Sequence, residues 1–187
     1  MVKKEVRVVG IDDAPFDKFK ETETFIIGVF YRGGNFMDGV LSAKVQIDGT
    51  DSTQAVSKMV RGSKFYPQLQ CIMLDGIAVG GFNIIDVREL SSETKLPVIV
   101  VVRDYPDFER ILSVLKKLGM ESKIALIENA GKPIRLGKIY AQLINISEDK
   151  AREIIRITAS HSFIPEPIRV AHLVASGIYF GESRGKV

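Results

Sequence analysis

The chain has 187 residues, of which 45% are hydrophobic, with a formal net charge of +3 and a pI of about 8.9. This size suits one domain with a sizeable core, and the mildly basic charge permits an anionic partner without requiring one. A single cysteine, Cys71, excludes a disulfide within the chain, and no apolar run approaches the length of a membrane span, so we expect a cytoplasmic protein without a membrane partner.

Three strand-like runs occupy the first third of the chain. Each is rich in β-branched and apolar residues, and the third alternates apolar and polar residues from Val40 onward. The segment RGGNF separates the second and third runs, and its two adjacent glycines can adopt the positive φ of a tight hairpin. The sequence therefore predicts an antiparallel meander of three strands, at residues 5–12, 24–31 and 37–48.

Helices and short buried strands alternate through the rest of the chain. Apolar residues at helical spacing predict the helices, and short apolar runs predict strands covered on both faces. A meander that leads through a helix into parallel strands, with helices on both faces, resembles the order of the ribonuclease H-like mixed α/β fold. We predict that fold class for one domain over residues 1–187, with helices at 51–65, 106–119, 147–161 and 166–180 and strands at 70–76, 96–103, 123–129 and 139–146.

Three acidic residues lie at the ends of these elements. Asp12 ends the first strand, Asp51 begins the first helix, and Asp75 ends the strand at 70–76. Open α/β sheets place their sites at such strand ends. Carboxylates 4 Å apart repel by roughly 4 kcal/mol per pair at an effective dielectric near 20, and Mg²⁺ or Mn²⁺, which prefer oxygen ligands, would offset that repulsion. The alternatives are that these acids are turn or cap residues, or that Asp48 replaces Asp51 as third ligand.

Five short motifs follow one another along the chain: VGID at 9–12, LDG with VGGFN at 74–83, PVIVVVR at 97–103, NISEDKA at 145–151 and IPEPIRVAHLVASG at 164–177. In this order they resemble motifs of the endonuclease V family. Three segments, GIDDAPF, the LDG and GGFN pair, and IPEPIRVAH, are more similar to a compact archaeal family related to it, the endonuclease dU family. That resemblance implies a ribonuclease H-like fold and Mg²⁺- or Mn²⁺-dependent cleavage of nucleic acid near a deaminated base such as uracil or hypoxanthine during DNA repair, with DNA expected in preference to RNA.

The resemblance also implies roles for single residues. Asp12 and Asp75 match two metal ligands, and Asp51 falls where endonuclease V has a glutamate at a helix start. Arg103 falls where that family has a lysine near the phosphate, and a guanidinium would hold phosphate through a planar fork. The Pro-Tyr-Ile-Pro wedge and the late histidine of endonuclease V have no counterpart, because VQIDGT and QLIN stand at those places. We therefore do not carry over specificity for inosine.

One further aspartate and the two histidines of the chain can also be considered as site residues. Asp13 is either an acid that orients a metal-bound water or a turn residue before Pro15. His172 lies inside a helix beside apolar neighbours, and we expect it to be packed or at the surface. His161 ends a helix, where a protonated imidazole would interact favourably with the helix dipole. We favour this structural role over that of a catalytic base.

Gly76, Gly80, Gly81 and Phe82 follow the second aspartate strand. The glycines would let a flipped base approach the backbone, and the phenyl ring would stack on that base. The alternative is an ordinary loop with a phenylalanine in the core. We retain all four residues as candidates for contact with a nucleic-acid base.

Two other functions fit the same residues. The first is a nucleic-acid or nucleotide-binding module that keeps the fold without catalysis, which the missing wedge and histidine would favour. The second is a metal-dependent phosphohydrolase for a small nucleotide, which the modest net charge leaves open. The salt dependence of binding separates these, because affinity for a polymer falls steeply with salt and affinity for a small anion falls less.

Overall fold

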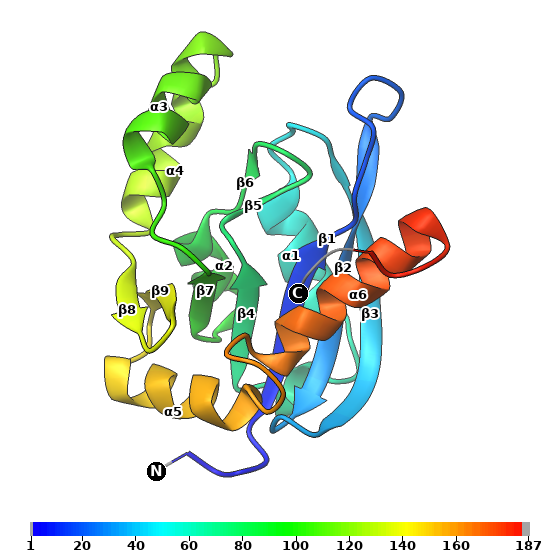
Figure 1. The fold of residues 1–187 in the computed structure, drawn as a ribbon, viewed down its shortest axis with the longest axis vertical. Coiled ribbons are helices and arrows are strands. Elements are labelled where there is room, and N and C mark those ends of the chain that lie inside the picture. Colours follow the sequence, from blue (N-terminus) through cyan, green and yellow to red (C-terminus); the bar gives the residue numbers. More distant parts are fainter. Residues whose placement is uncertain (1, 185–187) are drawn as a thin grey trace.

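The computed structural model describes residues 2–184, in which one seven-stranded sheet carries helices on both faces (Figure 1). The strand order is β3-β2-β1-β4-β7-β9-β8, and a separate two-stranded hairpin, β5-β6, follows β4 along the chain. The strands are β1 (Arg7–Asp13), β2 (Glu23–Arg32), β3 (Phe36–Gln46), β4 (Cys71–Asp75), β5 (Ala78–Val79), β6 (Asn83–Ile84), β7 (Val98–Val102), β8 (Ile134–Leu136) and β9 (Ile139–Ile144).

The first three strands form the predicted antiparallel meander. Gly33 adopts φ +60° in the turn between β2 and β3, as the glycine pair predicted, and its amide donates to the carbonyl of Val6. The centre of the sheet is parallel, because β1 pairs with β4 and β4 with β7 in the same direction. Strand β9 then pairs antiparallel with β7, and β8 closes that edge.

The helices lie in two layers. In the front layer of Figure 1, α6 crosses β1 and β2 while α5 lies across the lower end of the sheet, and α1 and α2 cover the opposite face. Alternate residues of each central strand therefore enter different cores. The helices are α1 (Ser52–Arg61), η1 (Tyr66–Gln68), α2 (Val87–Thr94), α3 (Phe108–Lys117), η2 (Glu121–Lys123), α4 (Ile124–Asn129), α5 (Glu148–Thr158) and α6 (Glu166–Phe180).

This alternation decides which way the strand ends face. In β1, Val8 packs in the core beneath α5 and α6, whereas Val9 and Ile11 pack in the core beneath α1 and α2. In β4, Met73 packs in the core beneath α5 and α6, and Leu74 packs in the core beneath α1 and α2. The residue after Ile11 and the residue after Leu74 therefore both face α6, because successive side chains of a strand point to opposite faces.

Several elements differ from the prediction. The short strands β5, β6 and β8 were not predicted, and two larger differences concern helices. Residues 123–129 were expected to form a strand and instead form the end of η2 and α4. Short apolar runs fit either structure, and here Ile124 and Ile127, three residues apart, pack with Leu115 of α3 in a small separate core. Helix α2 was not predicted, although Asp86 caps it by accepting from the amides of residues 88 and 89.

None of the helices within residues 2–184 combines the length and the apolar character needed to cross a membrane. Cys71 is fully buried within β4, where burial raises the pKa of its thiol. A buried and protonated thiol does not act as a nucleophile, so Cys71 is part of the core.

Candidate metal centre

Strand register brings two of the predicted acids together. Ile11 of β1 pairs with Leu74 of β4 in parallel register, so the next residues along the two strands are Asp12 and Asp75. Both carboxylates face α6, for the reason given above, and both lie at the carboxyl end of the parallel strands. The predicted meeting of Asp12 and Asp75 at one edge of the sheet is therefore present in the fold.

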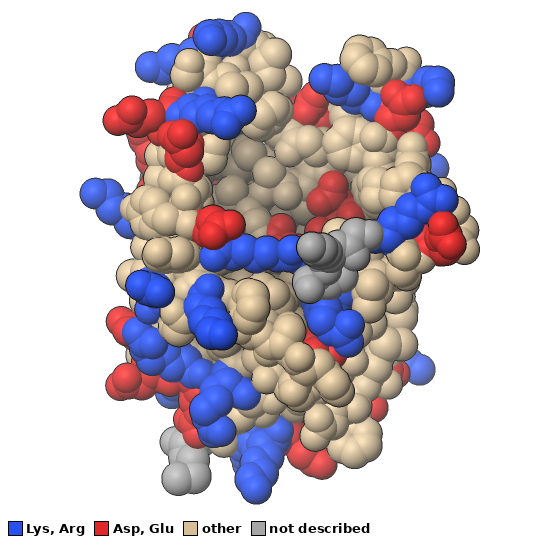
Figure 2. Space-filling view, viewed as in Figure 1, with Lys and Arg blue, Asp and Glu red and all other residues tan. Residues whose placement is uncertain are grey.

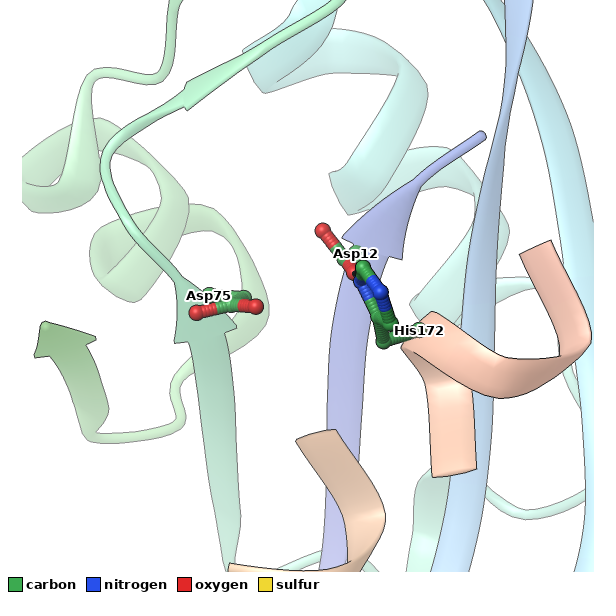
Figure 3. A group of neighbouring side chains, drawn as sticks. All are labelled: Asp12, Asp75 and His172. Atoms are coloured by element: carbon green, nitrogen blue, oxygen red, sulfur yellow. Dashed lines mark hydrogen bonds and ion pairs between the residues drawn. The ribbon is translucent and has the colours of Figure 1, made fainter. Parts of the chain in front are cut away.

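His172 completes a group of three potential metal ligands. Its Nδ1 lies 2.8 Å from Oδ2 of Asp12, and one ligand atom from each of Asp12, Asp75 and His172 lies within 4.8 Å of the other two. Figure 3 shows the two aspartates at the ends of their strands and the imidazole reaching them from α6. We expected His172 to be packed or at the surface; helix α6 instead delivers it to Asp12 across a sequence separation of 160 residues.

A close approach of α6 to β1 places the imidazole. A Cβ atom added to Gly10 would lie 2.5 Å from the amide nitrogen of Ile168, closer than real contacts allow. The backbones of strand and helix thus touch at Gly10, two residues before Asp12 and on the same face of the sheet. His172 lies one helical turn beyond Ile168, which sets it against Asp12. A glycine in the middle of an apolar strand was the signal in the sequence for this contact.

The carboxylates of this site are buried close together, and this shifts the pKa values of the groups around them. Burial and the charge of Asp12 raise the pKa of Asp75 to about 6, although Arg103 and His172 oppose the shift. Burial, with smaller contributions from the charges of Asp12 and Asp75, raises the pKa of Asp13 to about 6 as well. The pKa of His172 is raised because Asp12 hydrogen-bonds to its ring. A cation would stabilise the ionised form of these carboxylates against both their burial and their mutual repulsion.

The donor set fits a divalent cation. Two carboxylate oxygens and one imidazole nitrogen converge from three elements, and a cation bound there would keep further positions for water or a phosphate oxygen. Arg103, immediately after β7, lies on the same face, because Ile99 and Val101 of that strand pack beneath α5 and α6. Its charge lowers the pKa of Asp75, so Arg103 lies close enough to interact with this carboxylate. Its role near a phosphate stays a prediction.

Asp13 points to the other face of the sheet. Its Oδ2 accepts a hydrogen bond from the amide of Gly80 at 2.9 Å, so the carboxylate fastens the loop between β5 and β6 to the end of β1. Gly80 itself adopts φ +54° and packs beside Thr24. Asp13 thus adjoins the metal group, while its own hydrogen bond is to the loop.

Asp51 is not part of the group of three. Its Oδ1 accepts from the side-chain amide of Asn83 at 2.6 Å and from the backbone amide of Gln46 at 3.2 Å. Asp48 accepts from the backbone amide of Phe82 at 2.7 Å. The two rival candidates for third ligand therefore both hold the β5–β6 hairpin against the end of β3, and neither lies in the metal group.

The four candidates for base contact have different surroundings. Gly81 has φ +82°, and a Cβ there would collide with Oδ1 of Asp48, so glycine is required for the fold. Phe82 packs partly against the small core of α3 and α4. Gly76, at φ +78° directly after Asp75, has open space where a Cβ would project. Contact of Gly76, Gly80, Gly81 and Phe82 with a base stays a prediction.

Sequence reasoning missed Lys123, which connects the helical arm formed by α3, η2 and α4 to the site. Its side chain is only 6% exposed, and its ammonium donates to the carbonyl oxygens of Asp48, Gly49 and Phe82 at 2.7, 2.8 and 2.6 Å. All three donor positions of the ammonium are thereby used. A lysine in an apolar segment gave no sequence signal, because its acceptors are backbone carbonyls distant in sequence.

We expect Lys123→Met to destabilise the protein by about 2–3 kcal/mol, because the substitution leaves three buried carbonyl groups without a donor. Urea unfolding followed by circular dichroism measures this change. Lys116→Met, on the exposed side of α3, is the matched control and should change stability by less than about 0.5 kcal/mol. Equal stability of the two variants would show that the three hydrogen bonds of Lys123 do not stabilise the fold.

The face of the molecule in Figure 2 is hollowed between two projections. In Figure 2, carboxylates form part of the floor of a hollow between two rising arms, and Lys and Arg side chains are on both arms. Figure 1 identifies the arms as α3 with α4 on one side and the β1–β2 loop on the other. The cations on both arms would attract a negatively charged polymer toward the floor of this hollow.

Comparison with known proteins gives one family for nearly the whole chain. The family model described as endonuclease dU matches residues 4–179. The UPF0215 protein of Methanothermobacter thermautotrophicus is 48% identical over 189 residues, which cover 98% of this chain and 93% of that protein. The UPF0215 protein of Pyrococcus furiosus is 43% identical over 187 residues, covering 97% and 96%.

Solved structures give the same architecture. A protein of unknown function from Archaeoglobus fulgidus has a TM-score of 0.86 and 38% identity, over 92% of this chain and 98% of that chain. Endonuclease V of Bacillus subtilis has a TM-score of 0.63 and 13% identity, over 94% and 81%. Endonuclease V of Ciona intestinalis, in complex with DNA that contains inosine, has a TM-score of 0.58 and 15% identity, over 89% and 82%. The predicted ribonuclease H-like fold class is confirmed.

Proposed function

This chain belongs to the endonuclease dU family, and on that premise we propose that it is a metal-dependent endonuclease that hydrolyses a phosphodiester bond in nucleic acid. The observation that carries the proposal is the convergence of Asp12, Asp75 and His172 at the carboxyl end of the parallel strands. The similarity in fold to an endonuclease V in complex with DNA supports a nucleic-acid substrate, and we expect DNA in preference to RNA. The family match supports a deaminated base, for which uracil and hypoxanthine are the two candidates.

In this proposal Asp12 and Asp75 hold Mg²⁺ or Mn²⁺ through their carboxylate oxygens. The ion would supply activation of a water molecule and stabilisation of the leaving oxygen. His172 fixes the orientation of the Asp12 carboxylate through its Nδ1 and lies close enough to serve as the third ligand. Asp51 is left out of the ligands, because its carboxylate already binds Asn83 and a backbone amide.

Arg103 and the loop after β4 act on the substrate. The guanidinium of Arg103 attracts the phosphate group next to Asp75 and offsets its negative charge. Asp13 accepts a hydrogen bond from the Gly80 amide and so ties the β5–β6 hairpin to the end of β1, next to the acids. The open backbone at Gly76 then leaves room for a base beside the phosphate.

We expect cleavage of end-labelled oligonucleotides that contain uracil or hypoxanthine, in the presence of Mn²⁺ or Mg²⁺ and not with chelator. Asp12→Asn is expected to lower the rate at least roughly hundredfold and His172→Gln roughly tenfold to hundredfold, since the first removes a ligand and the second removes its support. Gel analysis of single- and double-stranded substrates measures the cleavage rates of both variants and shows which of the two bases directs cleavage.

Asp38→Asn is the matched control, because this exposed carboxylate pairs with Arg32 at the opposite end of the sheet. It should cleave like the wild type. Absence of cleavage on every oligonucleotide by folded wild-type protein would refute the proposal. Hydrolysis of free nucleotides alone would then favour a small-nucleotide phosphohydrolase, and tight metal-independent binding would favour a non-catalytic module.

A further inference from the structure

A cavity lies beside the metal group, between the end of α6 and the start of β2. Its volume is about 350 Å³, within the range of pockets that hold small ligands. Its lining is mixed, because two glutamates, Glu21 and Glu23, lie beside a lysine, a threonine and the apolar and aromatic side chains. None of the residues assigned above to metal or phosphate lines it. The residues that the argument uses are Pro15, Glu23, Phe25, Lys44, Ile178 and Tyr179.

Two independent geometries place this cavity next to the acids. Asp12 pairs with Ile27 of β2, so Phe25, two residues along β2, faces the same side of the sheet as Asp12. The spacings of a sheet put the two Cα atoms roughly 8 Å apart. On α6, Tyr179 follows His172 by two helical turns, or about 10 Å along the axis. The cavity is thus within reach of the nucleotide adjacent to one held at the acids.

The surface of the cavity suits a nucleobase better than a phosphate. The side chains of Phe25 and Tyr179 remain 40% and 38% exposed, although both are large aromatic groups. The cation in the cavity, Lys44, is already paired with Glu23 at 3.2 Å, and its ammonium lies 5.7 Å from the centroid of the Phe25 ring. Paired charges attract phosphate weakly, whereas exposed rings offer faces on which any base can stack.

We infer that this cavity binds an unpaired base of the substrate strand, adjacent to the nucleotide at the acids, by stacking on Phe25 and Tyr179. The inference rests on the proposed function, because it takes the strand at the acids as its starting point. The base must be unpaired and unstacked, since the faces of bases within a duplex are already covered. The site therefore selects for a single-stranded or locally opened segment.

Binding of a single-stranded oligonucleotide to an Asp75→Asn background, in chelator, tests this inference without cleavage. A 2-aminopurine placed at successive positions reports stacking, because its fluorescence falls when it lies against an aromatic ring. We expect one quenched position, loss of that quenching in Tyr179→Ala and Phe25→Ala, and roughly tenfold weaker binding for each. The slope of affinity against salt should not change, because no phosphate contact is removed.

Tyr179→Phe keeps the ring and should retain both affinity and quenching, which separates stacking from a structural effect. Phe36→Ala removes an exposed ring at the opposite end of β3 and should behave like the parent. Unchanged affinity and quenching in both alanine variants, with normal cleavage by the wild type, would overturn this inference alone. A parent protein that neither cleaves nor binds nucleic acid would overturn the proposed function as well. Dissociation of a dimer by Tyr179→Ala would show that a second copy of the chain occupies the surface.

Discussion

Asp75→Asn is expected to stabilise the metal-free protein at pH 7 by about 1–3 kcal/mol while abolishing its stabilisation by Mn²⁺ and its cleavage activity. The pKa of Asp75 is about 6 in the folded protein, against 3.8 in an unperturbed carboxyl, because the carboxylate is buried beside Asp12. Two pKa units correspond to roughly 3 kcal/mol that the folded state loses when Asp75 ionises. A neutral amide removes this cost and retains part of the cost of burial.

The sign of the pH dependence follows from the same shift. The unfolded chain releases the proton of Asp75 near pH 4 and the folded chain near pH 6, so the folded state binds more protons between these values. The stability of the metal-free wild type should therefore fall as pH rises from about 4 to 6 and then remain level with respect to this group. Asp13, whose pKa is also about 6, contributes in the same direction.

Urea unfolding at pH 5 and pH 7, in chelator and in excess Mn²⁺, measures all of these effects. At a hundredfold excess over its dissociation constant, a bound ion should stabilise the wild type by about 2.7 kcal/mol, and Asp75→Asn should show none of this increase. Asp38→Asn again serves as control and should respond to Mn²⁺ like the wild type. A metal-free Asp75→Asn protein that is less stable than wild type at pH 7 would show that the ionised Asp75 carboxylate does not destabilise the folded state.

The second large effect is expected for Gly10→Ala. The added methyl group would overlap the backbone of Pro167 and Ile168, which neither a rotamer change nor a flexible neighbour can relieve. Helix α6 must therefore move away from β1. We expect a loss on the order of 3 kcal/mol, or roughly a 10 °C decrease in Tm for a chain of this size.

The same displacement should separate His172 from Asp12. The chain has two histidines, so titration of the imidazole protons by NMR can follow His172 directly. Its pKa, raised in the wild type by the Asp12 hydrogen bond, should return toward the ordinary value in Gly10→Ala. Metal affinity should fall together with this pKa.

Gly28→Ala is the matched control, because Gly28 pairs with Ile11 on the neighbouring strand. A Cβ there would meet the flexible end of Met59 at 3.2 Å and side-chain atoms of Leu41 and Val9 at 3.3 Å, and it would meet no backbone atom this closely. We expect a loss of less than about 1.5 kcal/mol and an unchanged His172 titration. If Gly10→Ala and Gly28→Ala behave alike, the close approach of α6 to β1 does not position the imidazole.

Much of the sheet was predictable from local patterns. The meander follows from three strand-like runs and from a glycine pair at a hairpin, and both features are local in sequence. The pairing of Asp12 with Asp75 follows from the assumption that their strands are parallel neighbours, which the register confirms. The resemblance of several motifs to the endonuclease dU family is likewise confirmed by the match over residues 4–179.

The missed features depend on tertiary contacts. His172 reaches Asp12 only because α6 crosses β1 at Gly10, and nothing in the helix sequence records that crossing. Asp51 was grouped with the other acids because it begins a helix, yet the amide of Asn83 binds its carboxylate. The prediction of a strand at residues 123–129 was wrong for a local reason, since an apolar run of this length fits a helix or a strand equally well.

Asp12 and Asp13 are adjacent in sequence but point to opposite faces of the sheet, one toward α6 and the other toward Gly80. A single residue inserted into β1 would exchange these directions, since every side chain beyond the insertion would turn over. A residue inserted into the loop that follows, between Pro15 and Glu21, would leave both directions intact. In comparisons among related chains, we therefore expect the length of β1 to be invariant and variation in length to be confined to the loop beyond it.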